Sequence, residues 1–212
     1  MYKYVFFDFN GTLIDDCNLC LKILNWICKE YNLPNVSKRK YRSIFTFPVY
    51  NYYVALGFKV SHEDFSIIGD RFHYFYNKYS YEEVKLFKNV VRVLKTLKEK
   101  GITLICLSAS MQQTLEKQLK FYKIDKYFDY IVGLSDTFAR SKEEVAINFV
   151  KTHNIDTTKA LFVGDSIHDL EVANAIKAKC YLLPTGHTNK KRLLEVTPNV
   201  INDLKDLLLK II

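Results

Sequence analysis

Short, mostly apolar runs recur along the chain and predict the strands of a buried sheet. These runs are residues 5–7, 102–107, 130–133, 161–163 and 180–183. Apart from Thr103 they contain only aliphatic and aromatic residues, cysteine and glycine, which is typical of strands covered on both faces. Stretches with helical spacing of apolar residues separate the last four runs. Strands that alternate with helices predict an α/β fold with a parallel sheet.

The segment between the first two strands is far longer than one crossover helix requires, and its pattern is helical. Asp16 and Ser37 are expected to cap two helices, and a third helix over residues 48–56 ends at Gly57. Ser61 opens a fourth, longer helix. We therefore expect an all-helical domain over residues 16–85, inserted into a core formed by residues 1–15 and 86–212.

The expected insertion is rich in aromatic residues: 14 of the 31 Phe, Tyr and Trp residues of the chain lie between Tyr41 and Tyr81. A small domain needs large side chains to build a core, and this is the favoured interpretation. The alternative is an aromatic pocket for the organic part of a substrate. Some tyrosines could serve in both ways.

Composition excludes several classes of protein. With 49% hydrophobic and 25% charged residues, the chain is typical of a folded globular protein, and no apolar run is long enough to cross a bilayer. The net charge of +8 favours small anionic substrates. Apart from residues 38–42 the basic residues are dispersed, which indicates a solvated surface rather than a nucleic-acid site. The N-terminus runs directly into a strand, so we expect a cytoplasmic protein.

The five cysteines do not predict a disulfide framework, because their number is odd and no secretion signal precedes them. The spacing of Cys17 and Cys20 is that of a metal or redox pair, but no second pair of ligands follows at zinc-finger spacing. Cys20 also falls on the apolar stripe of its helix. We therefore interpret the cysteines as small buried hydrophobic residues.

Candidate catalytic residues follow the predicted strands. They are the segment Asp8–Leu13, Ser108 at the end of the second strand, Lys142 at the start of a helix, and the segment Gly164–Asp169. Each has an ordinary alternative role as a turn residue, a cap or a surface lysine. Because ligands bind at the carboxyl ends of parallel strands, their common position indicates one active site.

This set of motifs resembles the haloacid dehalogenase (HAD) superfamily, most closely its phosphatases with a helical cap, such as phosphoglycolate phosphatases. The resemblance covers the whole chain. It implies a Rossmann-like, HAD-like parallel sheet as the core, with residues 16–85 as the cap. It also implies short hinges near residues 15 and 85, about which the cap opens and closes. Arg42 and Tyr50 are candidate cap groups for contact with the leaving group.

The resemblance also implies a role for each motif residue. Asp8 is expected to be the nucleophile, Mg²⁺ to be the cofactor, and Lys142 to neutralise charge near Asp8. Asp169 is expected to hold a metal-bound water or to orient Lys142. The implied ligands of Mg²⁺ are Asp8, Asp165, Asp169 and the backbone carbonyl of Asn10. The implied phosphate-binding groups are Ser108, Gly11, Thr12, Lys142 and the backbone amide of Ala109. His168 is expected to be incidental.

One position departs from the phosphatase pattern. Asn10 stands where these enzymes normally carry a second aspartate, which protonates the leaving group and then activates water. An amide cannot transfer a proton at neutral pH. The leading hypothesis is a Mg²⁺-dependent phosphohydrolase of a small phosphorylated metabolite, acting as a monomer or homodimer through an aspartyl-phosphate. The alternatives are a degenerate phosphate-binding or regulatory protein, a dehalogenase and, less favoured, a mutase.

Overall fold

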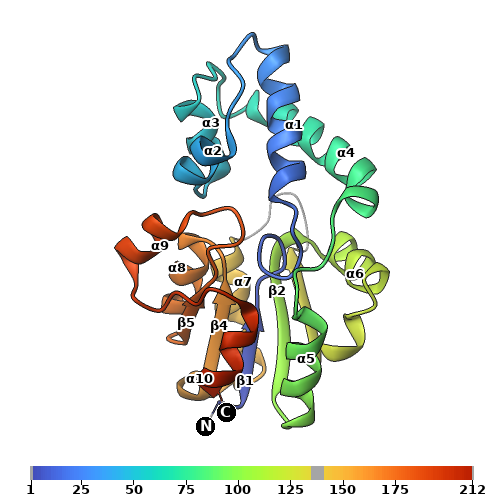
Figure 1. Cartoon of the computed structure of the whole chain (residues 1–212), viewed down its shortest axis with the longest axis vertical. Coiled ribbons are helices and arrows are strands. Elements are labelled where there is room, and N and C mark those ends of the chain that lie inside the picture. Colours follow the sequence, from blue (N-terminus) through green and yellow to red (C-terminus); the bar gives the residue numbers. More distant parts are fainter. Residues whose placement is uncertain (1, 135–140, 212) are drawn as a thin grey trace.

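The computed structural model describes residues 2–134 and 141–211, and its centre is a parallel five-stranded sheet (Figure 1). The strands lie in the order β3-β2-β1-β4-β5. Their bounds are β1 Tyr4–Phe7, β2 Thr103–Met111, β3 Tyr130–Leu134, β4 Ala160–Gly164 and β5 Lys179–Leu182. All five predicted strands are present, which confirms the α/β parallel-sheet prediction.

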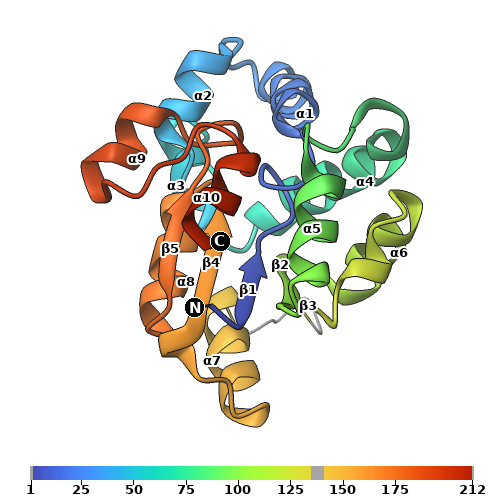
Figure 2. The ribbon, with the colours of Figure 1, turned by 60° about the horizontal axis from the view of Figure 1, so that its bottom comes forward.

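Helices cover both faces of the sheet (Figure 2). Successive side chains of a strand point to opposite faces, and β1 shows this clearly. Val5 and Phe7 pack in the hydrophobic cluster that includes α5 and α6, whereas Phe6 packs in the one that includes α7 and α8. These helices are α5 Val90–Glu99, α6 Gln112–Phe121, α7 Lys142–Thr152 and α8 Ile167–Ala175. Burial on both faces accounts for the apolar runs.

The chain between β1 and α5 forms the helical layer at the top of Figure 1. Its helices are α1 Cys17–Glu30, α2 Lys38–Ile44, α3 Val49–Ala55 and α4 Phe65–Glu83. Six of the fourteen aromatic residues between positions 41 and 81 are buried, among them Tyr41, Phe45 and Tyr52, and five more pack partly buried against the same core, as the core interpretation expects. Tyr41 and Tyr76 also direct their hydroxyl groups toward polar partners at the sheet edge.

The two connections between this layer and the sheet lie side by side. The amide of Asp15 donates to the carbonyl of Lys85 (2.8 Å), and that of Phe87 donates to Leu13 (2.9 Å). Ile14 and Leu86 form an antiparallel bridge between them. The chain thus leaves and re-enters the core at one point, as a pair of hinges would require.

The chain after β5 completes the core through α9 Lys190–Val196 and α10 Leu208–Ile211. Three short 3₁₀ helices complete the described elements: η1 Asp125–Tyr127, η2 Thr157–Lys159 and η3 Leu204–Leu207. Within residues 2–134 and 141–211, none of the helices combines the length and the apolar character that a bilayer span requires.

Two details of the sequence prediction are wrong. Ser108 does not end its strand, because β2 continues to Met111 and changes register between Leu107 and Met111. Asp16 does precede α1, but its side chain makes no capping bond. Its carboxylate is bound to residues from other parts of the chain instead. Ser37, by contrast, caps α2 through Lys40 as expected.

Candidate active site at the carboxyl edge of the sheet

A buried lysine joins two of the predicted catalytic carboxylates. Lys142, the first residue of α7, places Nζ 2.5 Å from Oδ1 of Asp8 and 2.6 Å from Oδ1 of Asp169. Asp8 directly follows β1, and Asp169 lies in the first turn of α8. All three side chains are buried. The contact spans 134 positions of the chain between Asp8 and Lys142, so only the folded sheet creates it.

Asp169 is held by the local structure of α8. Its Oδ2 accepts hydrogen bonds from the amides of Asp165 and Ser166 and from the Ser166 hydroxyl, and Ser166 Oγ in return accepts from the Asp169 amide. This is a capping box. One oxygen therefore caps the helix while the other binds Lys142. The capping box and the ion pair with Lys142 thus use different oxygens of one side chain.

Asp165 enters the same site from the end of β4 and is closely surrounded by backbone. The amide of His187 donates to its Oδ2, and the Thr12 hydroxyl donates to its Oδ1 at 3.3 Å. Gly11 has φ +74°, and a Cβ there would lie 2.6 Å from Asp165 Oδ2. Gly11 therefore allows both a left-handed turn and the close approach of the carboxylate.

The site contains three buried aspartates and one buried lysine, so burial and mutual repulsion both act on the pKa values of the carboxyl groups. Burial raises the pKa of Asp165 to about 8, although the His187 side chain partly opposes the shift; Asp169 and Asp8 add to it. Burial also raises the pKa of Asp8 to about 6, although Lys142 opposes the shift. Burial also acts to raise the pKa of Asp169, but the charge of Lys142 outweighs burial and lowers the pKa of Asp169.

This donor set fits a hard divalent cation. Carboxylate oxygens of Asp8, Asp165 and Asp169 lie within 4.8 Å of one another, and oxygen is the ligand that Mg²⁺ prefers. A cation placed among them would offset both the burial of Asp8 and Asp165 and their repulsion by neighbouring carboxylates, the two causes that raise their pKa values. The residues present therefore fit the metal that the resemblance implies.

The predicted phosphate-binding residues lie at the same edge of the sheet. Ser108 is buried at the register change of β2, and its Oγ accepts from the Ser110 amide at 3.1 Å. Ala109 is partly exposed beside it. A bulge of this kind re-aims side chains at the end of a strand. Ser108 therefore reaches the edge from within β2 rather than from a following loop.

Asn10 belongs to a polar network that the sequence did not predict. Its amide nitrogen lies 2.8 Å from both Asp16 Oδ2 and the Tyr76 hydroxyl, and its Oδ1 accepts from Ser110 at 3.0 Å. Asp16 Oδ1 lies 3.1 Å from Nε2 of His187. Asp16 was interpreted only as a cap, and nothing in the local pattern around His187 or Tyr76 marked either residue.

Neither candidate cap group points to the carboxylate cluster. The Arg42 guanidinium donates to the carbonyls of Pro184 and Thr188, which belong to the loop after β5. The Tyr50 hydroxyl donates to Val60 and its ring stacks on His62, so its described contacts stay within the helical layer. Arg42 thus binds the helical layer to the core. His168, expected to be incidental, stacks on Phe47.

The fold and the acidic edge define a class: α/β proteins with a helical insert that place a carboxylate, a lysine and an acidic metal-type cluster at the carboxyl ends of a parallel sheet. The family model described as haloacid dehalogenase-like hydrolase matches residues 5–183. The chain belongs to this family, as its motifs predicted.

Relatives and solved structures agree with that assignment. Phosphoglycolate phosphatase 1 of Pseudomonas aeruginosa is 33% identical over 132 residues, which cover 61% of this chain and 48% of that protein. The match thus spans about half the length of that relative. The phosphoglycolate phosphatase of Pseudomonas savastanoi is 26% identical, with 97% of this chain and 78% of that protein covered. A crystal structure of a predicted phosphatase from Clostridium acetobutylicum has the same fold, with a TM-score of 0.85, 21% identity, and coverage of 100% and 98%.

Proposed function

We propose that this protein is a Mg²⁺-dependent phosphohydrolase of small phosphomonoesters and that it acts through an aspartyl-phosphate on Asp8. The observation that carries the proposal is the Lys142 bridge between Asp8 and Asp169 beside the buried carboxylate of Asp165. The names of the relatives support a phosphate ester as the substrate class.

Asp8 has one oxygen bound to Lys142, which leaves Oδ2 for the attack on phosphorus. The bond from Asp8 to phosphorus forms as the bond from phosphorus to the leaving oxygen breaks. Because Asn10 cannot donate a proton, the leaving oxygen departs as an anion and takes its proton from solvent. Lys142 offsets the charge of Asp8, and Ser108 and the Ala109 amide bind the phosphoryl oxygens. Water then hydrolyses the acyl phosphate, which releases inorganic phosphate and restores Asp8.

Asp8, Asp165 and the backbone carbonyl of Asn10 would hold the Mg²⁺. Bound there, the cation supplies charge neutralisation between an anionic nucleophile and an anionic substrate. Asp169 acts by orienting Lys142, since its oxygens are engaged by that lysine and by the start of α8.

We further propose that residues 16–85 act as a cap over a core of residues 1–15 and 86–212. The paired connections at Ile14 and Leu86 support hinges at this position. The burial of Asp8 and Asp165 requires an opening motion for substrate to enter. Closure would exclude water from the reacting groups.

A second function has one observation in its favour. The Asn10 amide is fixed between Asp16, Tyr76 and Ser110 and cannot carry a proton. A protein that binds a phosphorylated ligand without turnover would keep the remaining site and lose only this group.

The deciding experiment is the release of phosphate from p-nitrophenyl phosphate and from 2-phosphoglycolate, with Mg²⁺ and with EDTA. We expect Mg²⁺-dependent turnover that Asp8→Asn abolishes while the circular dichroism spectrum stays unchanged. Asp70→Asn, an exposed change of the same kind, should retain full activity. Retention of activity by Asp8→Asn would exclude this mechanism. Binding of phosphate esters without turnover would support the second function.

A further inference from the structure

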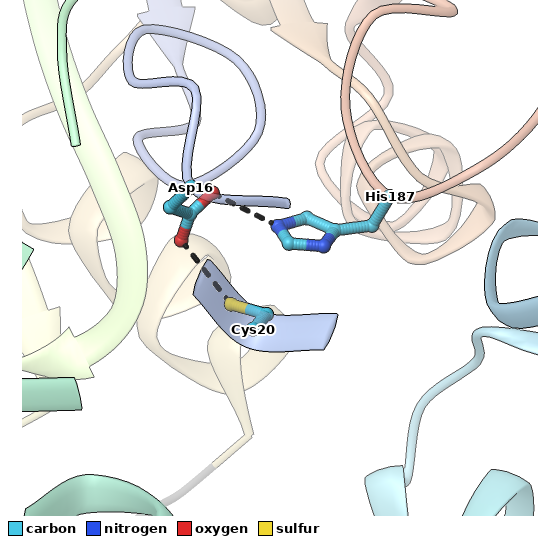
Figure 3. A group of neighbouring side chains, drawn as sticks. All are labelled: Asp16, Cys20 and His187. Atoms are coloured by element: carbon cyan, nitrogen blue, oxygen red, sulfur yellow. Dashed lines mark hydrogen bonds and ion pairs between the residues drawn. The ribbon is translucent and has the colours of Figure 1, made fainter. Parts of the chain in front are cut away.

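A second group of metal-ligating side chains lies beside the carboxylate cluster and contains a sulfur and a nitrogen donor. Figure 3 shows Asp16, Cys20 and His187 directed toward one another. Asp16 precedes α1, Cys20 lies in its first turn, and His187 comes from the loop between β5 and α9. All three are buried, and one ligand atom of each lies within 4.8 Å of the others.

Two separations within this group are close to those between ligands of one tetrahedral ion. Asp16 Oδ1 lies 3.1 Å from His187 Nε2, and Asp16 Oδ2 lies 3.7 Å from Cys20 Sγ. Typical zinc bond lengths at tetrahedral angles place nitrogen and oxygen ligands about 3.3 Å apart, and sulfur and oxygen ligands about 3.6 Å apart. Because the two contacts use different oxygens of Asp16, the carboxylate must rotate, or bind through both oxygens, to hold one ion together with Cys20 and His187.

Neighbouring hydroxyl and amide groups orient two of the three ligands. The Tyr41 hydroxyl lies 2.9 Å from His187 Nδ1, so the other ring nitrogen, Nε2, is the one that faces Asp16. Asp16 Oδ2 also accepts from the Tyr76 hydroxyl and the Asn10 amide, at 2.7 and 2.8 Å. Hydrogen bonds of this type fix ligand orientation at metal sites and raise metal affinity.

We propose that Asp16, Cys20 and His187 bind a thiophilic divalent cation of the Zn²⁺ class, which links the helical layer to the core. A sulfur, nitrogen and oxygen set suits Zn²⁺, whereas the neighbouring oxygen-only cluster suits Mg²⁺. Without metal, a protonated His187 and the Asp16 carboxylate form a neutral pair beside the Cys20 thiol. When metal binds, Cys20 and His187 each release one proton to solvent, and the two positive charges of the cation balance Asp16 and the thiolate.

The ion would affect the candidate active site through the position of the helical layer, without taking part in the proposed hydrolysis. The His187 amide binds Asp165, and Cys20 belongs to the helical layer. Coordination of both side chains would therefore oppose separation of that layer from the core. Bound Zn²⁺ would hold the cap closed and slow turnover.

The test is a titration of the chelator-treated full-length protein with Co²⁺, in excess Mg²⁺ to occupy oxygen-only sites. We expect one equivalent of Co²⁺ to give a thiolate charge-transfer band in the near ultraviolet and tetrahedral d–d bands, which one equivalent of Zn²⁺ removes. Cys20→Ser should abolish the charge-transfer band and weaken Zn²⁺ binding at least about 100-fold, since loss of an outer hydrogen bond alone costs 10–100-fold. Cys28→Ser is the matched control, because Cys28 is also buried in α1.

His187→Gln keeps a polar side chain at the second ligand position and should weaken Zn²⁺ binding in the same way. A Co²⁺ titration without a charge-transfer band would overturn the proposal. So would a band that survives Cys20→Ser and disappears in Cys17→Ser or Cys28→Ser. These spectra do not depend on catalysis: phosphate release measured on the same samples tests the proposed hydrolase separately.

Discussion

The amide nitrogen of Asn10 lies 2.8 Å from Oδ2 of Asp16, a buried carboxylate that the sequence places only at the start of a helix. The residue that departs from the phosphatase pattern thus sits against a negative charge. This contact changes what is expected when an aspartate is restored at position 10. Like charges at such a distance raise the pKa of one partner.

Restoring the carboxylate with Asn10→Asp should create a general acid. Beside Asp16 the new group would hold its proton, which is the form that protonates a leaving alkoxide. Turnover of alkyl phosphates should rise by up to about 10²–10⁴-fold, and that of p-nitrophenyl phosphate should rise much less because a phenolate leaves without protonation. Steady-state rates with saturating Mg²⁺ measure this. Asn154→Asp, at an exposed position, is the control. Unchanged rates in Asn10→Asp would show that another residue carries the proton.

Without metal, the stability of the protein should fall as pH rises from about 6 to 8. The raised pKa of Asp165 (about 8) means that the folded state binds more protons than the unfolded state over this range, whereas the raised pKa of Asp8 (about 6) acts mainly below pH 6. Stability is therefore lost as pH rises through these values. The expected loss is on the order of 2 kcal/mol, or about 4–8 °C in Tm.

Thermal unfolding in EDTA and in excess Mg²⁺ measures this effect, and Mg²⁺ should reduce the slope. Asp165→Asn should also reduce it. Part of the decrease in stability with pH should remain in this variant, because His187 contributes in the same direction. Burial lowers the pKa of His187, but Asp16 outweighs burial and raises that pKa well above its usual range. A Tm that rises between pH 6 and 8 without metal would contradict the assigned charges.

Gly11→Ala should remove activity and destabilise the fold more than a matched change elsewhere. Gly11 and Gly101 both have φ +74°, but a Cβ at Gly101 meets no atom within 4 Å, whereas one at Gly11 meets Asp165 and His187 at 2.6 Å. Gly101→Ala should therefore cost only about 1–2 kcal/mol of backbone strain. Urea unfolding and Mg²⁺-dependent turnover separate the two effects. Equal losses in both variants would show that the contact with Asp165 is unimportant.

Arg42→Ala should favour the open form of the cap. Arg42 donates to Pro184 and Thr188 across the boundary, and hydrogen bonds from charged groups contribute about 1.5–3 kcal/mol. The open population should rise about tenfold or more. Amide hydrogen exchange of residues 185–189 measures the change. Arg39→Ala, on the exposed side of the same helix, should leave exchange unchanged. If exchange is equally slow in both variants, Arg42 does not hold the cap.

The sheet and much of the candidate site could be predicted from the amino-acid sequence. Buried parallel strands need near-continuous apolar runs, and such runs are visible without a structure. Because the carboxyl ends of these strands meet at one edge, the positions of Asp8, Lys142 and Asp165 after separate strands were enough to predict that they meet. The helical insert was readable from the long separation of the first two predicted strands and from the helical pattern between them.

The partners of Asp16, Cys20 and His187 could not be predicted in this way, because the folded chain brings His187 to the other two from a distant position. The contact of Asp16 with His187 spans 171 positions, and no local period encodes it. A local pattern reports the cap position of Asp16 and the apolar stripe of Cys20, but a carboxylate binds whichever donors the fold brings within reach. Burial makes such unpredicted contacts obligatory, because a charge removed from water must find partners. The packing of the helical layer on the edge of the sheet brings these partners within hydrogen-bond distance of Asp16.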